Sequence, residues 1–151
     1  MSHAAPGYPE CVQVHPAETL TAPGGEPVQV DCGMVPLVRA LWACGMDTFQ
    51  CCQDVGASIY GGGWHYPEPR RVRYAAFWDG FAWLQLPIDD AERIMASTVD
   101  IAAGNGWECS IPIRAQGRRP GANLYFPARQ IPAVLGVLRG GMSGCGRGAP
   151  R

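Results

Sequence analysis

The sequence contains no lysine, and its twelve basic residues are all arginine. A GC-rich genome tends to encode arginine in place of lysine whatever the function of the protein. The missing lysine therefore excludes no function by itself. The chain also lacks any apolar run near the roughly 20 residues that a membrane-spanning helix needs. Its start, residues 1–6, has neither the basic nor the apolar part of a secretory signal. We therefore expect a soluble, cytoplasmic protein with no membrane partner.

The common sequence motifs of enzymes are missing as well. No P-loop, no dinucleotide-binding G-x-G-x-x-G after a strand, no H-E-x-x-H and no G-x-S-x-G occurs. The seven cysteines form no C-x-x-C pair, their number is odd and no export signal precedes them, which favours reduced thiols over a disulfide framework. We expect no cofactor, and the question of catalysis stays open with the balance against it.

The composition is that of one folded domain. Apolar residues make up 47% and charged residues 17% of the 151 residues, which is a globular balance. Residues 1–27 carry five prolines and the pair Gly24-Gly25, so we expect a flexible N-terminal segment there. Residues 140–151 contain five glycines and are expected to be a disordered tail. A single α+β domain is predicted for residues 28–139.

The charges are distributed unevenly. Residues 1–69 hold seven acidic residues against Arg39 alone, whereas residues 109–151 hold seven arginines and no acidic residue. A basic C-terminal quarter is compatible with binding to nucleic-acid phosphates. It is equally compatible with neutralising the acidic half, within one molecule or between subunits. Nucleic acid, a nucleotide, another protein and a second copy of the chain therefore all stay open as partners.

Hydrophobic periodicity predicts the first elements. Residues 27–32 alternate apolar and polar side chains as a half-buried strand does. Pro36 suits the first turn of a helix that ends near Gly45. Residues 47–53 are predicted to be a second strand.

Residues 72–88 are predicted to form a β-hairpin. Two apolar runs, residues 72–78 and 81–86, flank Asp79-Gly80, and an Asp-Gly pair tolerates the positive φ angles of a type I′ turn. One face of this hairpin would carry an aromatic stripe, and the other face would also be apolar. The stripe comprises Tyr74, Trp78, Phe81 and Trp83. We interpret it as part of the core rather than as a base-stacking platform, because large aromatic side chains stabilise packing.

The second half is predicted to repeat this order. A helix follows residues 89–90 and ends at residues 104–106. Residues 107–113 and 122–126 then form a hairpin around the basic loop 116–121, and a last helix starts near Pro132. The fold class is therefore α+β: a mixed, mainly antiparallel sheet with two or three helices packed on it. A duplicated strand-helix-strand-strand unit of ferredoxin-like style would explain the order.

The segment 51–73 is the most unusual part of the chain and is the predicted binding loop. Three consecutive glycines allow close approach of the backbone to a ligand, aromatic residues offer stacking faces, and arginines bind phosphate or carboxylate. A loop of this length inside a compact domain is often functional. The candidate ligand-binding residues are Gln53, Trp64, His65, Tyr66, Arg70, Arg71 and Arg73.

The same segment offers weaker candidates for metal binding and catalysis. Cys51, Cys52, His65 and Cys109 are ligand types suited to zinc, and Cys51 and Cys109 would meet if strand pairing joined them. Cys51 or Cys52 with His65, oriented by Asp54 or Glu68, would make a thiol nucleophile with its base. Because the spacing is poor and buried cysteines often serve as small apolar residues, we predict neither a metal site nor a catalytic residue.

Two stretches carry a family resemblance. Residues 37–53, LVRALWACGMDTFQCCQ, and residues 65–73, HYPEPRRVR, resemble uncharacterised small proteins of actinobacteria and their phages. Those proteins have a helix ending in Leu-Trp-x-x-Gly, a strand ending in Ser-Cys-Gln and a later Tyr-Pro-x-Pro. The likeness covers residues 35–78, with a looser match at 123–138, and Cys51 stands where the family has serine.

The resemblance implies no established activity. It implies that a set of residues from the helix-strand turn and the binding loop lie near one another. This set is Cys52, Gln53, His65, Pro67, Pro69 and Arg71. From the sequence we therefore expect a small non-enzymatic binding or regulatory protein of phage or mobile-element type that recognises an anionic ligand through residues 51–73. The alternatives are a thiol- or zinc-dependent enzyme centred on Cys52 and His65, and a structural or assembly protein.

Overall fold

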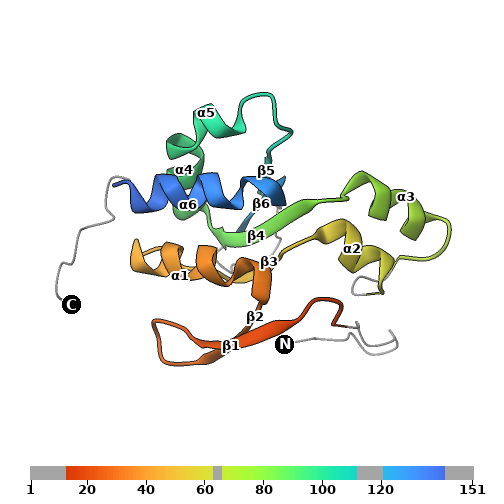
Figure 1. Cartoon of the computed structure of the whole chain (residues 1–151), viewed down its shortest axis with the longest axis horizontal. Coiled ribbons are helices and arrows are strands. Elements are labelled where there is room, and N and C mark those ends of the chain that lie inside the picture. The colour runs from red at the N-terminus through yellow and green to blue at the C-terminus, as the bar shows by residue number, and fades with distance from the viewer. Residues whose placement is uncertain (1–12, 63–65, 112–120, 142–151) are drawn as a thin grey trace.

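A computed structural model describes residues 13–62, 66–111 and 121–141 (Figure 1). In these residues the chain forms six α-helices and two antiparallel sheets, of two and four strands. The α+β class is thus confirmed. The expected mixed sheet is wrong, because every strand pair in the described ranges is antiparallel. None of the described helices has the length and apolar character that crossing a membrane requires.

The elements follow one another along the chain in an alternating order. They are β1 (Ala17–Thr21), β2 (Pro27–Asp31), a 3₁₀ turn η1 (Cys32–Met34), α1 (Val35–Ala43), β3 (Gln50–Cys52), α2 (Val55–Tyr60), α3 (Arg70–Phe77), β4 (Phe81–Pro87), α4 (Ile88–Ser97), α5 (Val99–Ala102), β5 (Glu108–Ser110), β6 (Gly121–Pro127), a 3₁₀ turn η2 (Ala128–Gln130) and α6 (Ile131–Arg139). The predicted strand at 27–32, helices α1, α4 and α6, and the pairing of β5 with β6 are confirmed.

The two-stranded sheet lies partly in the segment that was expected to be flexible. β1 pairs antiparallel with β2, from Ala17 opposite Asp31 to Thr21 opposite Pro27. Leu20 is buried in the main core. The prediction of a flexible segment is therefore wrong for this part of it, because the stretch between Pro16 and Pro23 is free of proline and alternates like a strand. Residues 1–12, and 142–151 of the expected tail, lie outside the described residues.

The four-stranded sheet has the order β3-β4-β6-β5, and its central strands divide the molecule into two cores. Along β4 and β6, alternate residues point to opposite faces, as the period of a strand requires. On one face lies the aliphatic core, which α1, α4 and α6 cover (Figure 1). Its strand residues are Ala82, Leu84, Leu86, Ala122, Leu124 and Phe126. The expectation of two or three helices packed on the sheet is confirmed.

The opposite face carries a smaller cluster with many aromatic side chains. Trp83 and Tyr125 project there from β4 and β6 and meet α2 and α3. Trp78 stacks on Tyr125 with ring centroids 4.3 Å apart, and its edge contacts Phe81 at 5.6 Å. We call this the aromatic cluster; it comprises Cys52, Val55, Ile59, Tyr66, Ala75, Trp78, Trp83 and Tyr125.

The predicted hairpin at residues 72–88 is wrong in its first half. Residues 70–77 form helix α3, and only residues 81–87 form a strand, which pairs with β3 and β6. The inward residues Arg71, Ala75 and Trp78 are spaced four and three apart, as on one helix face. Gly80 does adopt a positive φ, of 73°, but it turns the chain from a helix into a strand. The first predicted repeat therefore lacks its third strand, and the duplicated ferredoxin-like unit is not formed.

Helices α2 and α3 pack tightly against each other and extend to one side of the sheet (Figure 1). The Gly56 N–H donates to the Trp78 carbonyl at 3.1 Å. A Cβ at Gly56 would lie 2.5 Å from the Ala75 carbonyl oxygen, so only glycine fits between the two helices. We call α2 and α3 together the α2–α3 arm. The expected long binding loop, residues 51–73, thus contains α2 and the first turn of α3.

Candidate functional site

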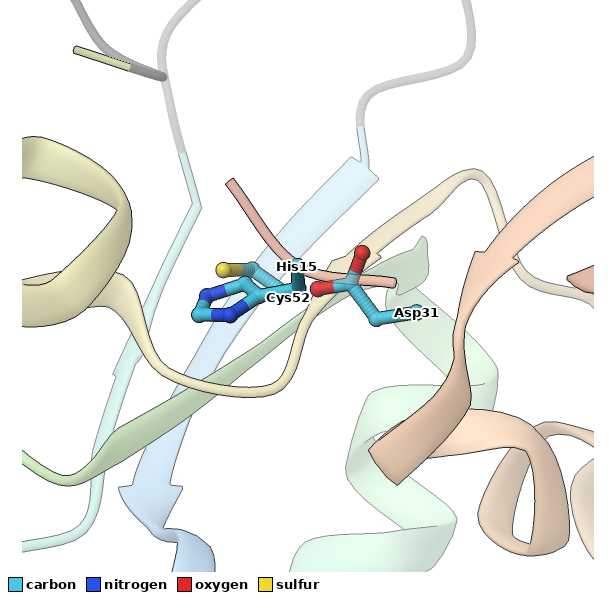
Figure 2. A group of neighbouring side chains, drawn as sticks. All are labelled: His15, Asp31 and Cys52. Atoms are coloured by element: carbon cyan, nitrogen blue, oxygen red, sulfur yellow. The ribbon is translucent and has the colours of Figure 1, made fainter. Parts of the chain in front are cut away.

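Three side chains of metal-ligand type converge where the small sheet, β3 and the α2–α3 arm meet (Figure 2). His15 precedes β1, Asp31 ends β2 and Cys52 ends β3. Each offers one nitrogen, oxygen or sulfur atom, and these atoms all lie within 4.8 Å of one another. Cys52 is buried, while His15 and Asp31 are half-buried. We call this group the His15–Asp31–Cys52 cluster.

Backbone pairing and two hydrogen bonds bring these residues together. Because Ala17 lies opposite Asp31, the chain just before β1 runs beside the end of β2. The Gln53 N–H donates to Asp31 Oδ2 at 2.9 Å, and Gln53 Oε1 accepts from the Gly33 N–H at 2.7 Å. Gln53, a predicted ligand-binding residue, thus joins the ends of β2 and β3.

His15 is held by a backbone carbonyl. Its Nε2 lies 3.0 Å from the carbonyl oxygen of Asp54. A carbonyl oxygen only accepts, so Nε2 carries the proton, and in the neutral ring Nδ1 keeps its lone pair. The carboxylate of Asp54 caps α2 by accepting from the Ala57 N–H at 3.0 Å and also accepts from the Gly80 N–H at 3.2 Å. Asp54, a weak catalytic candidate in the sequence, therefore holds α2 in place.

Cys52 is a poor nucleophile in this environment. Burial raises the pKa of Cys52 to about 12, and the carboxylate of Asp31 adds to the rise. The Asp54 N–H and the Ser58 hydroxyl donate to its sulfur and act in the opposite direction. Burial, Asp31 and Cys52 likewise raise the pKa of Cys51 to about 12. A thiol with so high a pKa is protonated at neutral pH.

The predicted meeting of Cys51 and Cys109 does not occur. Cys51 pairs with Leu84, Leu84 with Leu124, and Leu124 with Cys109. The two cysteines therefore lie at opposite edges of the sheet, three strand spacings or about 14 Å apart. Cys44 is disulfide-bonded, so the expectation of reduced thiols is wrong for this residue. Cys32, Cys51, Cys52 and Cys109 are free.

The remaining predicted ligand-binding residues have different environments. Tyr66 is half-buried in the aromatic cluster and contacts Tyr74 with ring centroids 4.9 Å apart. Arg71 forms an ion pair with Glu68. Arg70 and Arg73 are exposed on α3, and neither is in an ion pair within the described ranges. Trp64, His65 and most of the basic loop 116–121 lie outside the described residues.

The outer surface of the α2–α3 arm is unusually apolar. Seven large hydrophobic residues are exposed among those the structure describes, and four of them belong to the arm. These four are Tyr60, Val72, Tyr74 and Phe77. Tyr60 and Phe77 are about two-thirds exposed, at 68% and 67%. Between the helices lies a hollow lined by Gly56, Ala57, Tyr60, Val72, Ala75, Ala76 and Asp79.

Two residues of the His15–Asp31–Cys52 cluster, His15 and Asp31, were not predicted as site residues. His15 and Asp31 lie 37 and 21 positions before Cys52. No spacing motif connects them, because long-range strand pairing brings them together. Helix α3 had a local signal, the four- and three-residue spacing of its inward residues Arg71, Ala75 and Trp78.

Comparison of the chain with protein-family models, with curated proteins and with solved structures finds no match in any of the three.

Proposed function

We propose that this protein is a non-enzymatic binding protein whose α2–α3 arm docks on an acidic protein surface. The observation that carries the proposal is the concentration of exposed aromatic and aliphatic side chains beside Arg70 and Arg73 on one small element. Tyrosine, phenylalanine and arginine are enriched in protein interfaces, where aromatic side chains fill pockets and arginine binds carboxylates.

The shape of the arm supports a protein partner. The hollow between α2 and α3 is lined by the small residues Gly56, Ala57, Ala75 and Ala76, together with Tyr60, Val72 and Asp79. Such a hollow suits one apolar side chain of a partner, and Arg70 and Arg73 suit acidic residues around it. Nucleic acid is a weaker fit to the arm, because phosphate binding depends on many cations and gains little from exposed Val72 and Phe77.

Charge reversal tests the proposal with a matched control. The probe is a synthetic helical peptide with leucine and phenylalanine on one face and glutamate on the other, and its binding is measured by isothermal titration calorimetry. The double variant Arg70→Glu, Arg73→Glu should lose about tenfold in affinity. Arg39→Glu with Arg139→Glu changes the net charge equally on exposed positions of α1 and α6 and should bind as the unaltered protein does.

Two results would contradict this function. Equal losses in both double variants would mean that only net charge matters. Tighter binding to a single-stranded oligonucleotide than to the peptide, with a steep salt dependence, would assign the arm to nucleic acid instead. Sedimentation at high concentration separates a third case, in which the arm binds a second copy of the chain.

A further inference from the structure

We propose that His15, Asp31 and Cys52 bind a zinc ion that fastens the start of β1 and the end of β2 to the base of the α2–α3 arm (Figure 2). This inference is independent of what the arm binds. It rests on the identity of the three donors, on their separation and on the groups that surround them.

The donor set is typical of zinc. One imidazole nitrogen, one carboxylate oxygen and one sulfur are the three ligand types that zinc uses in proteins. A sulfur donor disfavours magnesium and calcium, which take oxygen ligands. Tetrahedral zinc, with bonds of about 2.0–2.3 Å, holds its ligand atoms about 3.4–3.8 Å apart. The three ligand atoms here lie within 4.8 Å of one another. Side-chain rotations that shift these atoms by about 1 Å are therefore sufficient to reach the spacing that zinc requires.

Hydrogen bonds from neighbouring groups orient each of the three ligands. Metal-bound histidine commonly donates its other N–H to a backbone carbonyl, and His15 makes this bond to Asp54. Asp31 Oδ2 is fixed by the Gln53 N–H at 2.9 Å. The sulfur of Cys52 receives hydrogen bonds from the Asp54 N–H and the Ser58 hydroxyl, which fix its position. Zinc binding replaces the S–H bond with an S–Zn bond, and the proton leaves to solvent.

The site would connect three segments that lie far apart in the sequence. Residue 15 precedes the first strand, residue 31 ends the small sheet, and residue 52 ends an edge strand of only three residues. Val14 lies beside Gly61 at the end of α2, so the chain around His15 already runs along the arm. A bound ion at this junction would hold the arm and the small sheet in one arrangement. Among described residues the cluster supplies three protein ligands, which leaves one coordination position for water or a bound molecule.

Cobalt substitution of the full chain tests the site. Protein stripped by a chelator is titrated with Co²⁺ and then with Zn²⁺. We expect one equivalent of cobalt to give a thiolate-to-metal charge-transfer band, which zinc removes. Cys52→Ser should abolish the band, and His15→Gln and Asp31→Asn should weaken zinc binding by more than about tenfold. Cys109→Ser removes an exposed free thiol at the far edge of the sheet and should change nothing.

The cobalt titration distinguishes a zinc site that uses Cys52 from its absence. A missing charge-transfer band in the unaltered protein, or a band that survives in Cys52→Ser, overturns the proposal. Far-ultraviolet circular dichroism checks that each variant folds. If Cys52→Ser does not fold, His15→Gln decides, because this residue is half-buried and precedes the first strand. Unchanged zinc affinity in folded His15→Gln contradicts the site, and a loss supports it.

Discussion

The two faces of the four-stranded sheet are built differently. The aliphatic core lies under three helices, and its strand residues Leu84, Leu86, Leu124 and Phe126 are almost fully buried. Within residues 13–62, 66–111 and 121–141, the α2–α3 arm covers the aromatic cluster on the other face, and the arm leaves its own outer side chains exposed. The first face is complete and supplies stability. The second is partly open, which is the expected state of a surface that binds a partner.

The largest expected difference is in the free energy of unfolding, when a phenylalanine is replaced by alanine in the aliphatic core and on the α2–α3 arm. Phe126→Ala removes a ring that is 1% exposed and contacts Trp107 at 5.0 Å between centroids. It should cost about 3–5 kcal/mol of unfolding free energy. Phe77→Ala, on the exposed face of the arm, should change it by less than about 0.5 kcal/mol while weakening binding of the acidic peptide. Urea denaturation measures both, and similar losses would show that the arm is part of the core.

Two glycine-to-alanine substitutions, one in the α2–α3 arm and one in α6, compare how closely the backbone is packed in these two regions. Gly56→Ala places a methyl group against the Ala75 carbonyl and the Asp79 backbone, so we expect a loss of about 1–3 kcal/mol. Gly136→Ala, exposed on α6 with open space around it, should instead gain about 0.5–1 kcal/mol from its higher helix propensity. Thermal melting measures whether each substitution raises or lowers the stability of the protein. A neutral Gly56→Ala would contradict the close contact of α2 and α3.

The last prediction concerns pH and the two adjacent thiols. Burial raises the pKa of Cys51 and of Cys52 from 9.0 to about 12, so the folded state keeps protons that the unfolded state releases. Stability should therefore be highest below about pH 9 and fall between pH 9 and pH 12, by about 1 kcal/mol per pH unit for each thiol.

The double variant Cys51→Ser, Cys52→Ser isolates this effect, because the tyrosines still titrate in it. Its stability should fall less steeply with alkaline pH than that of the unaltered protein, measured by urea denaturation with a chelator present. Parallel pH profiles would refute the effect. Added zinc should reduce the difference, since a zinc-bound thiolate no longer has a proton to lose on unfolding.

Strands were predictable from the sequence where buried and less buried side chains alternate along the chain. In β4, Ala82, Leu84 and Leu86 face the aliphatic core and Trp83 faces the aromatic cluster, as their spacing indicates. The neighbouring run Tyr74-Ala75-Ala76-Phe77 was assigned wrongly, because a short apolar run fits both a strand and a helix. The Asp79-Gly80 pair did not decide between them, since a positive φ at glycine serves the end of a helix as well as a hairpin turn.

The candidate sites were predictable only where local residues define them. Arg70 and Arg73 were singled out from their segment, and the structure leaves both exposed. The contact of His15 with Cys52 depends on two pairings between distant segments, β1 with β2 and the Asp31–Gln53 hydrogen bond. No local pattern encodes such contacts, so the sequence pointed to His65 as the partner of Cys52.

The proposed binding of a partner depends most on the exposed surface of the α2–α3 arm. Residue-resolved NMR, with the acidic amphipathic peptide titrated into labelled protein, tests this most directly. We expect helical Cα shifts for residues 70–77 and peptide-induced shifts at Tyr60, Val72, Arg73 and Phe77, with α4 and α5 unchanged. Strand-like shifts at 70–77, or peptide-induced changes confined to α4 and α5, would contradict it.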